Sequence, residues 1–344
     1  MKITDQKIYD ILALYGIREP VLERETLIYI DRPYKETRAV KLYIRLRLAS
    51  RPVVLKLLHL PMIRDDTPER QSRLSEAFRS RGLPTPECLA LTEKDHDRQY
   101  IASVRADSLR FLVKLEEDAG EGITEPDEAL APVLGCLLGK THSIAEKERL
   151  SVGPGAFYTE FTQRNTEYDL LWSMCGTDFL PVDMLDRIRT LYGEKMKILR
   201  ESFSSLPRFA VQGDLYYMNL TKKAAEYRVI DYDRMGDEVL LTDMILTWHR
   251  FWFDPHIFGP VTGTAKERAQ RERRLWEQFY TAYCAERKLT APELKQLGCT
   301  YQLLGSVYET RMLATIASAG KKELAAELLP EVEELLTRSC IFAR

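Results

Sequence analysis

The sequence lacks the cysteine patterns and hydrophobic runs that mark several protein classes. Its six cysteines are far apart, with no C-x-x-C pair and no metal-ligand spacing, at positions 88, 136, 175, 284, 299 and 340. They indicate free thiols in a reducing compartment rather than a disulfide scaffold or a zinc site. No apolar run reaches the roughly 18 residues that a membrane helix needs, and charged residues interrupt the amino end where a secretory signal would be apolar. We therefore expect a cytoplasmic protein with no membrane partner.

An excess of charge of either sign is also absent. The 50 basic residues nearly balance the 52 acidic residues, which gives a net charge of −2. This balance argues against a dedicated nucleic-acid-binding protein. With 344 residues, of which 45% are hydrophobic and 30% charged, the chain has the composition of a globular protein with a sizeable core. A chain of this length favours two domains.

Hydrophobic periodicity divides the chain into a β-rich first part and a mainly helical second part. Apolar residues at helical spacing predict a helix over 4–15, and the apolar runs 27–30, 39–46 and 52–58 predict an antiparallel meander. A further helix is expected from Thr67, which can cap it, to Gly82, which stops it.

The second part begins after a polar segment. Strands are expected at 100–104 and 111–115, and the polar residues 116–122 then mark a boundary. Beyond it, apolar stripes within 130–141 and 275–283 predict helices. Gly135 and Gly139 form a G-x-x-x-G pattern, which in such a helix indicates close packing rather than membrane dimerisation. We expect two domains, 1–114 and 115–344.

A short polar pattern in the second part carries the strongest chemical signal. Asp214 and Asn219 are five positions apart (219 − 214) on a predicted loop, and Asp231 ends the next apolar run, 12 positions later (231 − 219). Phosphoryl transfer from ATP needs one carboxylate that receives the acceptor's hydroxyl proton, and an amide oxygen and a second carboxylate that hold Mg²⁺. Asp and Asn also favour ordinary turns, but their order and spacing here indicate a phosphotransferase.

This segment resembles the aminoglycoside phosphotransferase and choline kinase superfamily, which carries H-G-D-x-x-x-x-N and then an apolar strand ending in I-D-[FW]-[DE]. Gly213, Asp214 and Asn219 match the first motif, and Asp231 matches the metal-binding Asp of the second. The resemblance implies ATP and Mg²⁺ as cofactors, with Asp214 as the catalytic residue. It implies Asn219 and Asp231 as ligands of the metal and the nucleotide.

The same resemblance implies the fold. Members of the superfamily share the two-lobed fold of protein kinases, an α+β architecture. Residues 1–114 would form a small β-rich nucleotide-binding N-lobe, and residues 115–344 a larger, mainly helical C-lobe that binds the acceptor. The match is motif-specific only from about residue 209 to 244.

Three other positions relate to the family pattern. Gln212 stands where the family has a His that is generally structural, and an amide can also donate and accept hydrogen bonds. Asp243 resembles a later family Asp that braces the catalytic loop. His142 resembles a helix-ending His and is expected to be packed and hydrogen-bonded rather than catalytic.

Lys56 lies late in the apolar run 52–58, where a kinase-like fold has the Lys that binds the α and β phosphates of ATP. A lysine on a solvated strand edge is the ordinary alternative. Its usual partner is a Glu on the following helix, and the sequence leaves two candidates, Glu69 and Gln71. We therefore expect Lys56 to bind nucleotide and leave its partner open.

A glycine-rich phosphate loop is absent from the early strands. The stretch 32–38 occupies its place, and its Lys35 and Arg38 favour a solvated turn over phosphate contacts. This absence disfavours a protein kinase more than a small-molecule kinase. In the second part, the aromatic stretch 248–253 fits either the wall of an acceptor pocket or the core.

The sequence as a whole predicts an ATP- and Mg²⁺-dependent phosphotransferase that acts on a hydroxyl of a small molecule, such as an aminoglycoside-like antibiotic or a metabolite. The alternative is a non-catalytic binding or structural protein on the same scaffold, because some bacterial spore-coat proteins resemble this family. Gln212 and the open partner of Lys56 favour that alternative. Retention of Asp214, Asn219 and Asp231 disfavours it.

Overall fold

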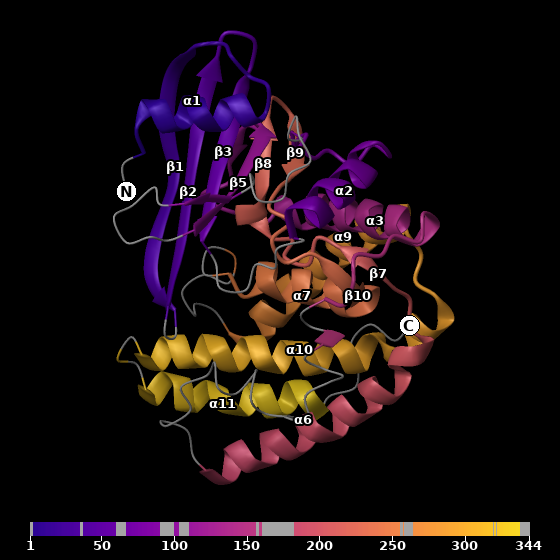
Figure 1. The fold of residues 1–344 in the computed structure, drawn as a ribbon. Coiled ribbons are helices and arrows are strands. Elements are labelled where there is room, and N and C mark those ends of the chain that lie inside the picture. The colour runs from indigo at the N-terminus through magenta and orange to yellow at the C-terminus, as the bar shows by residue number, and fades with distance from the viewer. Residues whose placement is uncertain are drawn as a thin grey trace. The chain divides into compact units, whose positions relative to one another are not determined.

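The computed structural model of the protein describes residues 3–34, 37–59, 67–89, 100–102, 110–155, 158–159, 182–254, 257, 264–318, 320 and 322–337. Contacts within the chain define two compact units. The first consists of Met1–Gly122 and Thr221–Asp233, and the second of Ile123–Leu220 and Arg234–Arg344. The chain thus leaves the first unit once and returns to it for a single segment (Figure 1).

The first unit is built on a five-stranded sheet with the order β1-β2-β3-β5-β4, in which neighbouring strands are antiparallel. A second, three-stranded sheet has the order β6-β8-β9. The elements are α1 (Asp5–Leu14), β1 (Val21–Tyr34), β2 (Thr37–Leu48), β3 (Pro52–His59), α2 (Thr67–Arg79), β4 (Tyr100–Ala102), β5 (Arg110–Glu117), β6 (Glu121–Gly122), β8 (Leu220–Lys223) and β9 (Glu226–Val229).

Strand alternation decides which side chains of the large sheet face its main core. In β3, Val53, Leu55 and Leu57 pack in one buried cluster with the apolar residues of α1, which lies across the sheet in Figure 1. Val54 and Leu58 belong to a smaller cluster on the opposite face. Because successive side chains of a strand alternate, Lys56 faces this opposite side.

The helix at 4–15 and the antiparallel meander of three strands are confirmed. The helix after residue 66 is also present, and Gly82, just beyond it, has φ +86°. The side chain of Thr67, the expected cap, lies outside the described residues. The expected domain boundary at 114/115 falls within β5, whose pairing with β3 continues to Glu117. As a division into folding domains, 1–114 and 115–344 stays a prediction.

The second unit is mainly helical in its described part, with one two-stranded sheet of β7 and β10. Its elements are α3 (Leu130–Lys147), α6 (Val182–Ser202), η2 (Phe203–Ser205), β7 (Arg208–Val211), η3 (Tyr217–Asn219), β10 (Gly236–Val239), α7 (Leu240–Trp252), α9 (Ala265–Glu286), α10 (Ala291–Ser318) and α11 (Lys322–Thr337). Helices α10 and α11 lie side by side, and α6 packs against both (Figure 1).

Helices α3 and α9 approach closely at two glycines. A Cβ on Gly135 would lie 2.1 Å from the carbonyl oxygen of Phe279, and a Cβ on Gly139 would lie 2.7 Å from that of Tyr283. Side chains at these positions would push the helices apart, so the G-x-x-x-G pattern serves helix packing, as expected. Within the described residues, no helix has the length and apolarity required to cross a membrane.

Candidate active site

The loop that carries Asp214 follows β7, which pairs with β10. Gly213 has φ +78°, and a Cβ there would lie 2.3 Å from the backbone oxygen of Arg234, so only glycine fits this turn. The backbone N–H of Asp214 donates to Oε1 of Gln212 over 2.7 Å, and Gln212 is buried. An amide at position 212 therefore braces the loop, in keeping with the structural role expected there.

Asn219 ties the other end of this loop to Asp214. Its Nδ2 donates to the backbone oxygen of Asp214 over 2.8 Å and to the carboxylate Oδ2 over 3.2 Å. Because the amide nitrogen is used in this way, the amide oxygen is the atom that stays available as a cation ligand. The structure thus brings two of the four predicted site residues into direct contact.

Two arginines flank the same carboxylate. Nη1 of Arg250, on α7, donates to Oδ1 of Asp214, and Nη1 of Arg234 lies 3.7 Å from that oxygen. The Arg250 side chain is largely buried, whereas that of Arg234 is half exposed. Burial opposes the charge of Arg250, but its interactions with Tyr308 and then Asp214 outweigh burial and raise its pKa well above the usual value. Neither arginine was expected at this site from the sequence.

Asp231 follows β9 in a strained conformation. Its φ is +59°, a left-handed value that non-glycine residues adopt mainly at turns and functional sites. The backbone N–H of Asp233 donates to Oδ1 of Asp231 over 3.2 Å, and Nζ of Lys41 lies 3.2 Å from Asp233 and 3.7 Å from Asp231. Burial and the charge of Asp233 raise the pKa of Asp231.

Lys56 is buried and has a carboxylate partner on the neighbouring strand. Its Nζ lies 2.5 Å from Oε2 of Glu116 on β5, and Nζ of Lys114 lies 3.1 Å from the other oxygen of Glu116. Lys56 and Lys114 are directly opposite each other in the β3–β5 pairing, so Glu116 offsets part of the repulsion between two like charges. This finding rules out the solvated strand edge and supplies the partner that the sequence left open.

The two candidates on α2 have other positions. Nε2 of Gln71 donates to Oδ1 of Asp233 over 2.9 Å, so its amide contacts a carboxylate rather than Lys56. The side chain of Glu69 lies outside the described residues.

Buried and partly buried charges of both signs therefore gather in the first unit. The cluster has three lysines and three carboxylates: Lys41, Lys56, Lys114, Glu116, Asp231 and Asp233. Burial opposes the charged forms, but attraction to the lysines lowers the pKa of Asp233, and attraction to Lys56 and then Lys114 lowers that of Glu116 to about 2. Coulombic attraction outweighs desolvation at both carboxyls.

His142 and Asp243 form a buried pair in the second unit. Asp243 Oδ2 lies 2.9 Å from Nε2 of His142, whose Nδ1 lies 2.8 Å from the hydroxyl of Tyr283. The packed, hydrogen-bonded His142 is confirmed. In the described part of the chain, the Asp243 carboxylate bonds His142 and not the Asp214 loop that it was expected to brace.

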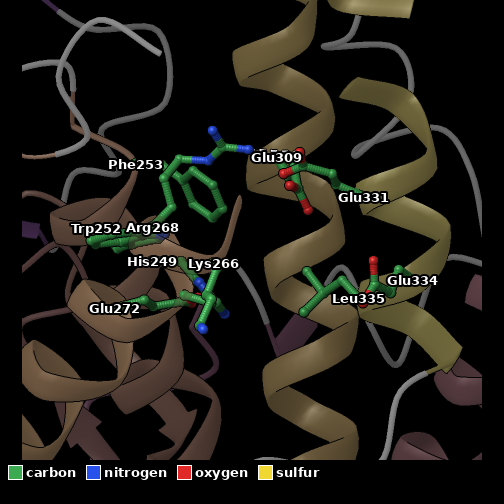
Figure 2. Close-up of a pocket in the computed structure, with 11 residues that line it drawn as sticks. His249, Trp252, Phe253, Lys266, Arg268, Glu272, Glu309, Glu331, Glu334 and Leu335 are labelled. Carbon is green, nitrogen blue, oxygen red and sulfur yellow. Dashed lines mark hydrogen bonds and ion pairs between the residues drawn. The ribbon is translucent and has the colours of Figure 1, made fainter. Parts of the chain in front are cut away.

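A cavity of about 270 Å³ lies between α7, α9, α10 and α11. Figure 2 shows aromatic side chains of α7 on one wall and glutamates of α10 and α11 on the other. The lining residues are His249, Trp252, Phe253, Lys266, Arg268, Ala269, Glu272, Glu309, Glu331, Glu334 and Leu335. The cavity lining as a whole contains four glutamates, one lysine and one arginine, and therefore has an excess of negative charge.

Helical rotation separates the aromatic stretch 248–253 into three roles. Trp248 and Phe251 are buried in the core. His249, Trp252 and Phe253 line the cavity, and of these His249 and Trp252 are also buried. Arg250 points to Asp214. Core packing is therefore confirmed for Trp248 and Phe251, and the wall of an acceptor pocket stays a prediction.

At the early hairpin, Arg38 forms hydrogen bonds with Asp31, with Nη2 2.6 Å from Oδ1, and Lys35 lies outside the described residues. Of the four predicted site residues, Lys56 and Asp231 belong to the first unit, and Asp214 and Asn219 to the second. In the described part of the chain, no group of three or more His, Cys, Asp or Glu side chains is arranged to hold a metal ion by itself.

Solved structures share this architecture. An amicoumacin kinase in complex with AMP-PNP, Ca²⁺ and Ami aligns over 96% of this chain and 93% of its own, with a TM-score of 0.59 and 14% identity. A microcompartment-associated aminopropanol kinase aligns over 97% of this chain and 100% of its own, with a TM-score of 0.60 and 15% identity. The chain has the fold of these small-molecule kinases.

The kinase-like α+β fold expected from the sequence is thereby confirmed. No protein-family model matches the chain, and no curated protein matches it either. Activity is therefore inferred from the side chains of the site itself.

Proposed function

We propose that the protein is an ATP- and Mg²⁺-dependent phosphotransferase that moves the γ-phosphate of ATP to a hydroxyl of a small molecule. One observation carries the proposal: Asp214 and Asn219 are hydrogen-bonded to each other on a glycine-dependent loop of a kinase-like fold. This arrangement offers a carboxylate to the acceptor and an amide oxygen to a cation.

Asp214 is proposed to position the acceptor hydroxyl and receive its proton. A carboxylate is in general only a weak base toward an alcohol. Weak basicity suits phosphoryl transfer, because the loose transition state requires little deprotonation of the acceptor before it is reached. Orientation of the hydroxyl is then the main contribution of Asp214.

Lys56 is proposed to bind the α and β phosphates. Its ammonium is buried and held by Glu116, so it is positioned before nucleotide binds. A lysine fixed in this way loses little side-chain entropy on binding the phosphates.

Asp231 and Asn219 are proposed as ligands of Mg²⁺. The pair Asp231 and Asp233 gathers negative charge that a divalent cation would relieve, which fits such a role. Mg²⁺ commonly binds through one or two protein oxygens together with substrate phosphates and water, so a site without a complete set of protein ligands also fits. The ion supplies charge neutralisation for the transferring phosphoryl group.

The cavity beside α7 is proposed to hold the acceptor. Its aromatic wall and its excess of glutamates suit an ammonium group, through cation–π and ionic contacts. An amine-bearing alcohol, an aminoglycoside-like antibiotic or a related metabolite, therefore fits better than an anionic acceptor. The name of the aminopropanol kinase with the same fold agrees with this class.

Two measurements test the proposal. Mg·ATP should raise the melting temperature of the protein, because a ligand that binds only the folded state stabilises it. A screen of amino alcohols and aminoglycosides should then reveal acceptor-dependent release of ADP. Absence of nucleotide binding would instead favour the non-catalytic binding protein on the same scaffold.

A further inference from the structure

Both oxygens of the Asp214 carboxylate already have partners within the second unit. Oδ1 accepts from Arg250, and Oδ2 accepts from Asn219 over 3.2 Å. The Asn219 contact closes the loop. An acceptor hydroxyl that donates to Oδ1 must therefore share this oxygen with Arg250 or displace it.

Arg250 is also connected to the cavity. Its Nε donates to the hydroxyl of Tyr308 over 3.0 Å. The Tyr308 ring is stacked on Phe253, with ring centroids 6.4 Å apart and planes 6° from parallel, and on His249, with centroids 6.1 Å apart. Phe253 and His249 line the cavity. A continuous set of contacts thus runs from the cavity wall through Tyr308 and Arg250 to Asp214.

We propose that Arg250 and Tyr308 form a latch that keeps Asp214 from orienting water and that opens when the cavity is filled. This proposal rests on the proposed function. A ligand against Phe253 and His249 shifts the stacked Tyr308, and the guanidinium that it holds moves with it. Asp214 then becomes available to the hydroxyl of the bound acceptor rather than to solvent.

The reaction that the latch suppresses is hydrolysis of ATP. In that reaction a water oxygen forms a bond to the γ-phosphorus, and the bond from that phosphorus to the bridging oxygen breaks. ADP leaves with the electron pair, and the water proton passes to the solvent or to the released phosphate. Water competes with the acceptor alcohol at an open kinase site. Keeping the Asp214 carboxylate from orienting water therefore protects ATP from hydrolysis.

The latch is fixed firmly enough to act in this way. The Arg250 side chain is only 16% exposed, so its ion pair with Asp214 is poorly screened by solvent. Its two hydrogen bonds, to Asp214 and to Tyr308, leave from different nitrogens of one planar group. In the proposed latch, the rigid guanidinium couples a displacement of Tyr308 to the Asp214 contact.

The test compares ATP hydrolysis without acceptor in four variants. Arg250→Met removes the latch and should raise acceptor-independent hydrolysis about five- to thirtyfold, the range that follows from losing one well-made interaction. Arg250→Lys should restore part of the suppression, because a cation remains beside Asp214. Tyr308→Phe should raise hydrolysis to a smaller extent and lower the ratio of transfer to hydrolysis when acceptor is present.

Arg187→Met is the matched control, because it removes an exposed arginine that bonds Glu333 on the surface of the same unit. It should leave hydrolysis unchanged. Unchanged hydrolysis in both Arg250→Met and Tyr308→Phe, with wild-type transfer intact, overturns the latch alone. Absence of nucleotide binding and transfer in the wild type overturns the proposed function and the latch with it. Because Arg250→Lys and Tyr308→Phe are conservative, misfolding of Arg250→Met does not remove the test.

Discussion

Replacement of Glu116 by glutamine isolates the contact that holds Lys56. Glu116 is 5% exposed, and its two oxygens lie 2.5 Å from Lys56 and 3.1 Å from Lys114. Glutamine keeps the shape of the side chain but removes the charge. Two buried ammonium groups, directly opposite each other in the sheet, then have only more distant carboxylates, the nearest to Lys114 being Asp233 at 3.9 Å.

The magnitude follows from the pKa of Glu116. Burial raises it, but Lys56 and then Lys114 outweigh burial and lower it from 4.5 to about 2. The two pKa values differ by about 2.5 (4.5 − 2), and a pKa difference of one is equivalent to about 1.4 kcal/mol, so the folded state gains about 3 kcal/mol of stability. Removal of one partner from a buried ion pair typically costs about 3–5 kcal/mol, which agrees. We therefore expect Glu116→Gln to lower the free energy of unfolding by about 3 kcal/mol at pH 7.

Urea denaturation at pH 7 measures this loss, and Glu117→Gln is the matched control. Glu117 is on the same strand, but its side chain is 30% exposed and pairs with Lys223 and Arg228. Its replacement should cost no more than about 1 kcal/mol. Adding Lys114→Met to Glu116→Gln should recover part of the stability, because it removes one unpaired ammonium. Equal small losses in both single variants would refute this account of the buried pair.

The pH dependence of this variant has a definite sign. A carboxyl whose pKa is depressed by folding contributes stability that is complete above its unfolded value and is lost as pH falls toward its folded value. The difference in stability between wild type and Glu116→Gln should therefore be constant above about pH 5. It should shrink as pH falls from 4.5 toward 2.

Three further predictions concern the proposed catalytic loop and metal ligand. Asp214→Asn should lower transfer by roughly 10²-fold or more while nucleotide affinity stays near normal; unchanged transfer would exclude Asp214 as the positioning carboxylate. Asp231→Asn should abolish the Mg·ATP-dependent rise in melting temperature, and an undiminished rise would remove Asp231 from the metal site. Gln212→Ala leaves the partly buried N–H of Asp214 without its acceptor and should destabilise the protein by about 1–3 kcal/mol, whereas Gln212→His should cost less; equal losses in a melting experiment would contradict the bracing role.

The parts of the fold that were predictable from the sequence are those with a local signal. The first helix and the three-strand meander followed from hydrophobic periodicity, and both are present. The Asp214 loop followed from a motif whose glycine, aspartate and asparagine are neighbours along the chain. The hydrogen bonds from Asp214 to Gln212 and from Asn219 to Asp214 join residues two (214 − 212) and five (219 − 214) positions apart, so the sequence alone contained this part of the information.

The partner of Lys56 depended on strand register, which the sequence does not show. Lys56 meets Glu116 because β3 pairs with β5 in a register that sets Lys56 opposite Lys114. A shift of one residue would have turned Glu116 to the other face of the sheet. One available signal was the alternation of Leu112, Lys114 and Glu116, which places all three side chains on the same face of a strand.

The contact of Arg250 with Asp214 could not be predicted from the sequence for a different reason. It lies in a run of aromatic residues, and hydrophobic patterning described that run as core or pocket without separating its members. The position of Arg250 on α7 directs its side chain away from the aromatic side chains and toward Asp214, 36 residues away in the sequence. Contacts between helices of one unit are set by packing angles, which periodicity does not contain.

The charge balance of the first unit gives a physical reason for the proposed dependence on Mg²⁺. Lys41, Lys56 and Lys114 are matched by three carboxylates in the same cluster, so the cluster has no net positive charge for a nucleotide. A triphosphate that approaches Lys56 also approaches Glu116, whose pKa of about 2 keeps it ionised at neutral pH. The repulsion between them must be offset by a cation that arrives with the nucleotide. In the proposed function, a divalent ion held by Asp231 would meet that need, and the lysines would orient phosphates whose charge the metal would largely neutralise.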